Sequence, residues 1–309
     1  MSVPAAYLGI VIIWATTPLA IQWSGDDVGP MFGLTARMAV GTLLSLLLLW
    51  ALRVRLPWDR ASIRCYGAVT LALYGTMTCG YWAAQYVPSG LLSVMFGLTP
   101  LVTGLLGMLW LNERAFTGGK LIGLLMALSG LAIIFRADLS AYPDAWLGIC
   151  LLLFGVTLNG ASMVLVKRNG ATLHALAQST GGLLLAFPCY VLTWFLLDGL
   201  ALPETVPVRN VFAIGYLAVF GSVIGLLLFY YALKRVNTGS VALITLITPV
   251  LALFLGSWIN HEAVSASVWM GAGVVLAGLA LYQWPLRRRS IGPPVLGGRK
   301  SLINTDEAE

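Results

Sequence analysis

Residues 99–113 read TPLVTGLLGMLWLNE, and residues 248–262 read TPVLALFLGSWINHE. Both stretches open on Thr-Pro, continue with mainly apolar residues and end on a glutamate. A gap-free alignment of residues 81–113 with residues 230–262 pairs nine identical residues, including both Thr-Pro pairs and both terminal glutamates. The chain therefore contains an internal repeat.

The repeat extends beyond these stretches. After one deleted residue, GLLMALSGLA at 123–132 lies over GAGVVLAGLA at 271–280, and YLGI at 7–10 echoes WLGI at 146–149. We therefore predict two related domains, followed by a polar cytoplasmic tail that is expected to be disordered. Their predicted bounds are 1–137, 138–285 and 286–309.

The composition predicts a membrane protein. Of the 309 residues, 59% are hydrophobic and only 10% are charged, whereas a soluble domain carries about 25% charged residues. A transmembrane helix needs about 20 mainly apolar residues, and such runs recur throughout the chain. We predict ten of them, at 5–23, 30–52, 63–84, 89–111, 119–135, 145–166, 173–197, 211–233, 239–260 and 267–285.

Each half holds five of these spans. Because five is odd, the second half enters the membrane from the opposite side to the first. Inverted repeats of this kind build many secondary transporters, whose substrate site lies near the bilayer midplane between the halves. The predicted fold is an all-α membrane protein, in which two inverted-topology five-helix repeats surround a central cavity.

The loop charges predict the orientation, because cytoplasmic loops retain Lys and Arg. Taken alternately, one set of loops together with the C-terminal tail holds fifteen such residues, and the other set holds only Arg136 and Arg209. Both termini are therefore expected in the cytoplasm, at a bacterial-type inner membrane. Topology and attraction to anionic lipid explain the net charge of +6, so the lipid bilayer is an expected partner and nucleic acid is not.

Several classes of chemistry are disfavoured. The four cysteines have no CxxC spacing, and the two histidines, His174 and His261, fall at helix ends. The spans carry no Asp or Glu away from their ends, which argues against a carboxylate proton relay. Without a nucleophile–base pair or a metal cluster, a membrane-embedded hydrolase is not expected either. We predict no catalytic residue, no metal and no cofactor.

Four motifs carry a family resemblance. They are WATTPLAIQW at 14–23, the Arg of LTARMAVG at 34–41, Thr-Pro with the closing LNE at 99–113, and GLLMALSGLAIIF at 123–135. With these motifs, each half resembles an EamA domain of the drug/metabolite transporter superfamily, and the likeness covers nearly all of residues 5–285.

The resemblance implies ten helices in a basket around a central cavity, and transport, often export, of amino acids or other small metabolites. It does not identify the substrate. The halves also differ, because the second half has Gln178 where the first has Arg37 and has no proline to match Pro18.

Pro100 and Pro249 each lie about ten residues into their helix, or about 15 Å along it, near the bilayer centre. A proline removes a backbone donor and frees a carbonyl, which only neighbours or a wet cavity can satisfy. We interpret the pair as hinges whose freed carbonyls are substrate ligands. A simple packing kink is the alternative.

Arg37 is the charged residue placed well inside a span. Such an arginine is costly in a bilayer and is a functional candidate, because its fork can bind a substrate carboxylate through two hydrogen bonds. The alternatives are that it snorkels outward or clamps backbone carbonyls between helices.

Neutral polar and aromatic side chains at suitable depths are the other candidate substrate contacts. Each could instead serve an interhelical hydrogen bond or packing. These candidates are Trp14, Thr16, Thr17, Thr76, Ser93, Thr99, Asn159, Gln178, Thr245 and Thr248.

Aromatic residues and glutamates mark the span ends. Gates at the two mouths are predicted at Tyr81, Trp82, Tyr230 and Tyr231, with an aromatic belt as the alternative. Glu113 and Glu262 end helices that run in opposite directions, so they should lie at opposite faces. Each is expected to accept N–H groups that open the next helix, with proton coupling as the alternative.

Together these features predict a secondary transporter, an exporter or facilitator of small metabolites that works by alternating access between the halves. Amino acids or related compounds are the leading substrate class. Efflux of hydrophobic drugs or dyes is the main alternative, and a non-transporting membrane scaffold is a remote one. The oligomeric state stays open.

Overall fold

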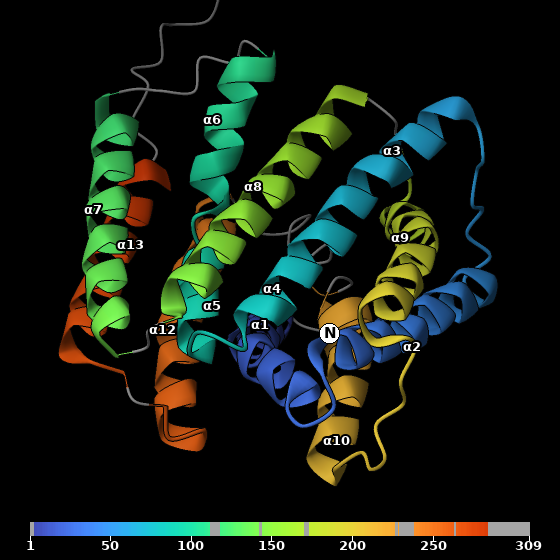
Figure 1. The fold of residues 1–309 in the computed structure, drawn as a ribbon. Coiled ribbons are helices and arrows are strands. Elements are labelled where there is room, and N and C mark those ends of the chain that lie inside the picture. The colour runs from blue at the N-terminus through green and yellow to red at the C-terminus, as the bar shows by residue number, and fades with distance from the viewer. Residues whose placement is uncertain are drawn as a thin grey trace, which may run out of the picture.

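The computed structural model describes residues 3–111, 118–141, 144–169, 173–225, 228, 238–262 and 264–283. Within these residues the chain is helical and contains no strand (Figure 1). Five helices are long and apolar enough to cross a membrane, and four shorter helices are apolar. A segmented helix over residues 60–83 completes ten spans. The protein is an all-α membrane protein, as predicted.

The first half contains five spans. The third span is continuous but changes helix type, and the fourth is interrupted by a turn at Gly97 and Leu98. The spans are α1 (Val3–Gly25), α2 (Pro30–Ala51), the third span of α3 (Arg60–Thr70), the π-helix η1 (Leu71–Thr76) and α4 (Met77–Ala83), the fourth span of α5 (Ser89–Phe96) and α6 (Thr99–Leu111), and α7 (Gly118–Ala141).

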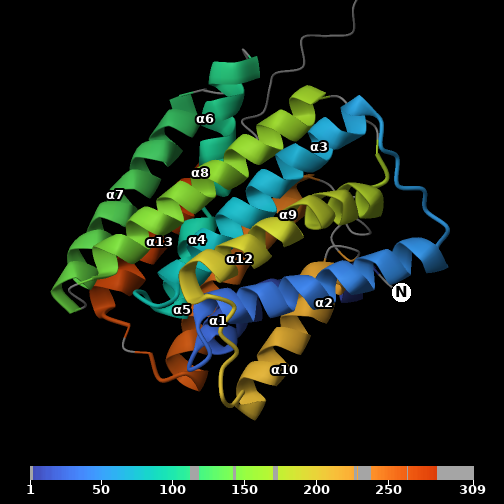
Figure 2. The same cartoon turned by 45° about the vertical axis from the view of Figure 1, so that its right-hand side comes forward.

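The second half repeats the pattern. The eighth span of the chain, like the third, begins as an α-helix and then changes to a π-helix. Helices α8, α3 and α9 lie side by side (Figure 2). The spans are α8 (Ala145–Asn169), α9 (Ala175–Asp198), the eighth span of α10 (Val208–Tyr216) and the π-helix η2 (Leu217–Ile224), α12 (Thr238–Ile259) and α13 (Ala266–Gln283).

Local chemistry sets where some helices begin. The third span starts three residues earlier than predicted, because the Asp59 carboxylate accepts the N–H groups of Ala61 and Ser62 at the helix N-terminus. The hydrogen bond from the Ser62 hydroxyl is the main cause that lowers the pKa of Asp59. Pro30 begins α2, where its missing N–H costs nothing.

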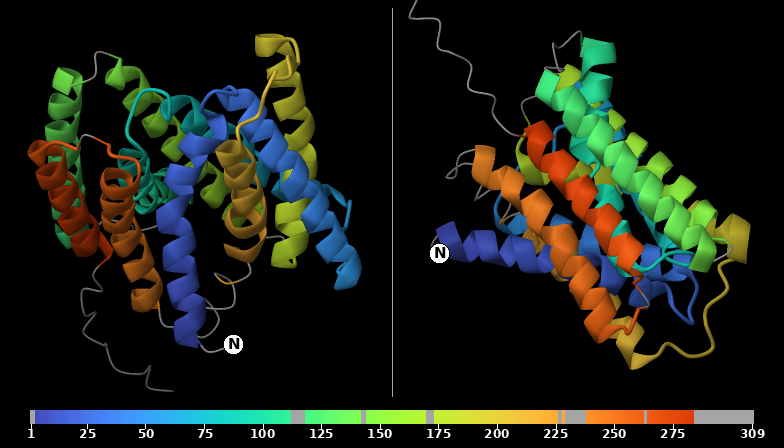
Figure 3. Two further views of the ribbon diagram at one scale, coloured as in Figure 1. Left: turned by 90° about the horizontal axis from the view of Figure 1, so that it is seen from below. Right: turned by 90° about the vertical axis from the view of Figure 1, so that its left-hand side faces the viewer.

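Small residues reveal the symmetry of the fold. Helices α7 and α13 lie side by side (Figure 3), and a Cβ on Gly123 would lie 2.6 Å from the Gly278 carbonyl, while one on Gly130 would lie 2.6 Å from that of Gly271. The repeat aligns Gly123 with Gly271 and Gly130 with Gly278. The two contacts are therefore one contact made twice, as an antiparallel crossing on a pseudo-twofold axis requires.

Other helix pairs obey the same symmetry. Helix α6 packs on α8, and α12 packs on α1; the repeat exchanges these two pairs. The fourth span and α12 also meet directly, since a Cβ on Gly90 would lie 2.7 Å from the Cα of Leu253. Large apolar side chains such as Trp50, Phe212 and Leu121 are exposed on the outside of the bundle, where a bilayer would cover them.

Candidate functional site

A cavity of about 210 Å³ lies at the centre of the bundle. Five elements line it, namely α1, α2, the third span, α9 and the eighth span, so both halves contribute to it. Its walls are formed by Trp14, Arg37, Met38, Leu73, Met77, Ser179, Leu183, Gly221 and Ser222.

The cavity lies on the pseudo-twofold axis. The offset that aligns Arg37 with Gln178 also aligns Met38 with Ser179, and the offset of the Thr-Pro motifs aligns Leu73 with Ser222. Met38 and Ser179 both line the cavity, as do Leu73 and Ser222, whereas Arg37 lines it and its counterpart Gln178 does not. Matched lining of this kind is expected of a substrate site between inverted repeats.

Both π-helices border the cavity. In the alignment of the Thr-Pro motifs, η1 corresponds to residues 220–225, which overlap η2. Both halves therefore have a π-helix at the same place. A π-turn widens the helix and is frequent at functional sites. Here η1 presents Leu73, and η2 presents Gly221 and Ser222. Sequence reasoning missed both segments, because their residues read as ordinary apolar helix.

Arg37 brings charge into this space. Its side chain is 5% exposed, and its Nε and Nη1 atoms have no hydrogen-bond partner within the described part of the chain. A Cβ on Gly221 would lie 3.3 Å from Nη2, so the glycine leaves room for the guanidinium. The uncharged residues that line the cavity could also have been found from the sequence, because the two repeat alignments pair Met38 with Ser179 and Leu73 with Ser222.

Trp14 and Thr17, two of the three candidates on α1, lie at or beside the cavity. Trp14 lines it, and a Cβ on Gly221 would lie 3.9 Å from the Thr17 hydroxyl, which donates to the Ile13 carbonyl at 2.7 Å. The Thr16 hydroxyl shares a 2.5 Å hydrogen bond with the Tyr216 hydroxyl and so ties α1 to α10.

Other candidates are engaged between helices. The Thr76 hydroxyl donates to the Gly155 carbonyl at 2.9 Å, which joins η1 to α8. The Asn159 amide donates to the Thr99 hydroxyl at 3.5 Å and joins α8 to the fourth span. None of these three side chains lines the cavity.

The remaining polar candidates are placed as follows. Ser93 and Thr248 are buried away from the cavity lining, and Gln178 is half-buried beside Ser179, which does line it. The side chain of Thr245 lies outside the described residues.

The two Thr-Pro motifs are not equivalent. Pro100 follows the turn that separates α5 from α6, whereas Pro249 lies inside the continuous helix α12. Pro100 cannot donate to the carbonyl of Phe96, and the Thr99 hydroxyl donates to it instead at 2.7 Å. That carbonyl is therefore already satisfied within the fourth span. A Cβ on Gly97 would lie 3.6 Å from the Pro249 ring, so the turn that precedes Thr99 packs near Pro249 of the other half.

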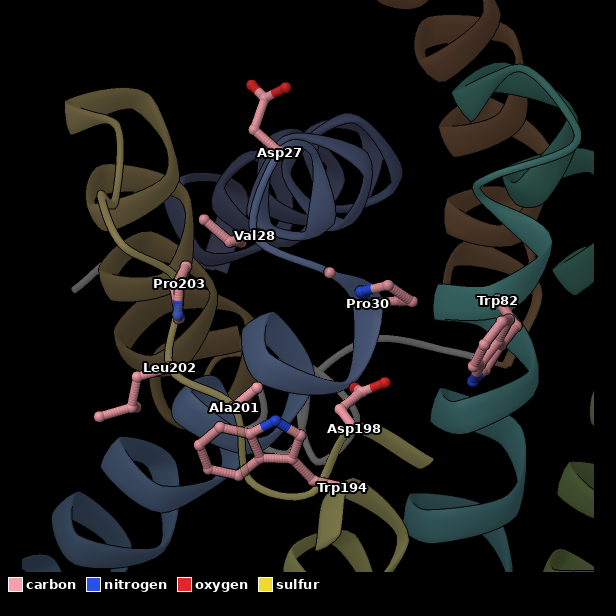
Figure 4. Close-up of a pocket in the computed structure, with 10 residues that line it drawn as sticks. Asp27, Val28, Pro30, Trp82, Trp194, Asp198, Ala201, Leu202 and Pro203 are labelled. Carbon is pink, nitrogen blue, oxygen red and sulfur yellow. The ribbon is translucent and has the colours of Figure 1, made fainter. Parts of the chain in front are cut away.

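A second pocket, of about 430 Å³, lies at the end of the bundle that carries the α1–α2 turn. The loop charges predict that this end faces outward, and we refer to the pocket as the vestibule (Figure 4). Its lining is Asp27, Val28, Gly29, Pro30, Trp82, Trp194, Asp198, Ala201, Leu202 and Pro203.

The vestibule and the central cavity share α2, α9 and the third span. Along α2, Pro30 of the vestibule lies seven residues before Arg37, or about 10 Å. In Figure 4 the Asp198 carboxylate lies below Pro30, while the Asp27 carboxylate points upward, away from the other labelled side chains. The same three elements thus line both the vestibule and the central cavity.

The predicted gate residues separate into three cases. Trp82 lines the vestibule. Tyr81 is 1% exposed and turns into the core, where its hydroxyl accepts a hydrogen bond from Ser24 at 3.0 Å. Tyr230 and Tyr231 lie outside the described residues.

A polar network joins α1 to α12 at the same end of the bundle. The side-chain oxygen Oδ1 of Asn260 accepts from the Trp23 indole at 2.9 Å. Its side-chain nitrogen Nδ2 donates to Gln22 at 3.2 Å and to Glu262 at 3.0 Å. Beside it, Arg209 forms an ion pair with Asp26 at 3.1 Å.

Glu262 differs from its predicted role. Its carboxylate accepts from Asn260, and the Ser265 hydroxyl accepts the Val268 N–H at the start of α13. The glutamate instead lies against Gly256, since a Cβ there would be 2.5 Å from its Oε2. Glu113 lies outside the described residues.

Burial raises the pKa of Asp26, and the Arg209 guanidinium opposes this by lowering it.

Ten apolar spans in two inverted repeats, closed around a cavity on their common axis, define an integral membrane protein of the transporter class. The model of the EamA-like transporter family matches residues 3–136 and 146–283. The chain belongs to this family.

Relatives named as transporters align along most of the chain. An uncharacterized transporter of Synechocystis is 27% identical over 94% of this chain and 93% of its own length. A probable terminal-alkyne amino-acid exporter of Streptantibioticus cattleyicolor is 28% identical over 91% and 92%. A solved structure with 19% identity superposes with a TM-score of 0.61 over 91% of this chain and 96% of its own, which supports the fold.

Proposed function

We propose that the protein is a secondary transporter of the bacterial inner membrane, an exporter or facilitator that moves small metabolites by alternating access. The cavity on the pseudo-twofold axis is the observation that carries the proposal. It is small, it receives side chains from both halves, and among the described residues it combines an apolar wall with one charged side chain and two hydroxyls.

The symmetry supports alternating access. The vestibule approaches the cavity along α2, α9 and the third span. The repeat exchanges α2 with α9 and the third span with the eighth, so the related route on the other side runs along α2, α9 and the eighth span. Rocking the third and eighth spans against α2 and α9 would open one route while closing the other.

Amino acids are the leading substrate class. The cavity offers a guanidinium for a carboxylate and an apolar wall of Met38, Leu73, Met77 and Leu183 for a side chain. A relative with 28% identity is named as a probable amino-acid exporter, which agrees with this choice.

Counterflow in proteoliposomes tests the proposal. Vesicles are loaded with unlabelled amino acids and related metabolites, and entry of each labelled compound is followed with and without a pH gradient. Selective exchange that ignores the gradient is the expected result. Failure of folded protein to exchange any compound would contradict the proposal.

Efflux of hydrophobic drugs is the second candidate, and the apolar cavity wall together with Trp14 favours it. Overproduction of the protein should then raise resistance to a panel of dyes and drugs. Metabolite counterflow without resistance would exclude it. If neither assay responds, a scaffold role gains support.

A further inference from the structure

We infer that the central cavity selects small carboxylates and that the Arg37 guanidinium is the group that recognises them. The inference rests on the proposed transport function and names the substrate class of the same site.

The charge of the cavity is unbalanced. Arg37 is buried, and its Nε and Nη1 atoms lack partners within the described residues. No acidic side chain lines the cavity in the part of the chain that the structure describes. A buried, unpaired cation is expensive, and a bound carboxylate would supply both the opposite charge and the missing acceptors.

The geometry suits a two-point contact. A two-point contact pairs Nη2 with either Nε or Nη1, and both Nε and Nη1 lack a partner within the described residues. Gly221 has no side chain to crowd Nη2, whereas a Cβ at this position would lie only 3.3 Å from that nitrogen. Arginine binds carboxylates through two parallel hydrogen bonds, a geometry that lysine cannot reproduce.

The remaining lining fits the rest of a small molecule. The Ser222 hydroxyl already donates to the Leu217 carbonyl at 3.1 Å but can still accept. The volume of about 210 Å³ is below the roughly 300–1,000 Å³ typical of ligand pockets. A short aliphatic carboxylate is therefore the expected ligand.

The vestibule carboxylates do not cancel the central charge. Asp27 and Asp198 are exposed, and α2 places the vestibule about 10 Å from Arg37 along the helix. Water and salt screen exposed charges over a similar distance. Arg37 therefore dominates the electrostatics of the cavity.

Matched ligands test the inference. For each of several apolar amino acids, counterflow is measured with the amino acid, its deaminated carboxylic acid and its carboxamide. In every series that exchanges, we expect both carboxylates to exchange at least about tenfold better than the carboxamide, since the carboxamide loses the charge-assisted contact. Arg37→Gln should abolish this preference, and Arg37→Lys should retain only part of it.

Binding without transport gives a second readout. The carboxylates should raise the melting temperature of the purified wild-type protein and leave that of Arg37→Gln unchanged. Arg168→Gln, the same substitution at an exposed residue near the end of α8, should behave as the wild type. The melting curves also show whether each variant is folded.

Two failures are distinct. If no compound exchanges, the transport function itself fails. If the carboxamide exchanges as well as the acids, or if folded Arg37→Gln keeps the wild-type preference, transport stands and the carboxylate inference is overturned.

Discussion

At the scale of single residues, the guanidinium of Arg37 is proposed to bind the ligand, but it also lowers the stability of the ligand-free protein. It is buried with two unpartnered nitrogens in the described structure, and a group of this kind lowers the stability of the ligand-free protein. Sites shaped for a ligand often carry such a cost.

We therefore expect Arg37→Met to stabilise the purified, ligand-free transporter by about 1–3 kcal/mol, because it removes unpaired buried donors. Thermal melting in detergent, paired with counterflow, checks this, and transport should be lost. A lower melting temperature would instead favour the role of Arg37 as a clamp between helices.

Thr99 offers a second test at this scale. Its hydroxyl donates to the Phe96 carbonyl that Pro100 leaves without a backbone donor. Thr99→Val should destabilise the protein by about 1–3 kcal/mol, the cost of an unsatisfied buried acceptor.

Thr157→Val is the matched control. The Thr157 hydroxyl is exposed and donates to the Leu153 carbonyl within α8, where the helix already supplies a backbone donor. Its effect should stay within about 0.5 kcal/mol. Equal melting temperatures for the two variants would show that the fourth span does not need the Thr99 hydroxyl.

At the scale of elements, the π-helix η2 gives the guanidinium its space. A Cβ on Gly221 would come within 3.3 Å of Nη2, whereas one on Gly215 in the preceding α10 would meet nothing within 4 Å. Gly221→Ala should therefore displace the guanidinium and raise the KM for a carboxylate several-fold, and Gly215→Ala should not.

Both alanines improve helix propensity by a similar amount, about 1 kcal/mol, so melting temperatures separate this effect from the steric one. An unchanged KM in Gly221→Ala would mean that Arg37 does not contact the ligand on that side.

The crossing of α7 and α13 depends on backbone contact. A Cβ on Gly130 would lie 2.6 Å from the Gly271 carbonyl, and a backbone atom cannot move aside as the end of a side chain can. Gly130→Ala should destabilise the protein by about 1–3 kcal/mol through overpacking.

Gly273, also on α13, is exposed, and a Cβ there meets nothing within 4 Å. Gly273→Ala should be neutral or stabilise by up to about 1 kcal/mol. Thermal melting of both variants checks the pair, and similar shifts would contradict close packing at the pseudo-twofold axis.

At the scale of the whole molecule, the Asn260 network is expected to hold the two halves together at the predicted outer end. Asn260→Ala removes three side-chain hydrogen bonds that link α12 to Gln22 and Trp23 and engage Glu262. The α1–α12 contact should then open more often.

A cysteine in place of Ser89, which is fully buried and lies near Gly256 and Glu262, reports the opening. A membrane-impermeant maleimide added to intact cells should label Ser89→Cys several-fold faster when Asn260→Ala is also present. Protein that retains Ser89 is the background control. Labelling from the cytoplasmic side alone would reverse the predicted topology.

Much of the architecture could be predicted from the sequence. Span count, the repeat and its inversion follow from hydropathy and alignment, because a bilayer requires each crossing segment to be long, apolar and internally hydrogen-bonded. Arg37 also stood out, since an intramembrane charge is rare enough to notice without coordinates.

The tertiary structure alone decided which neutral residues face the cavity. Thr76, Thr99 and Asn159 looked like Trp14 in depth and polarity, yet they bond between or within helices while Trp14 lines the cavity. The rotation of a membrane helix about its axis is set by packing against its neighbours. The π-helices and the unequal Thr-Pro motifs are also visible only in the tertiary structure, since no local pattern in the sequence records them.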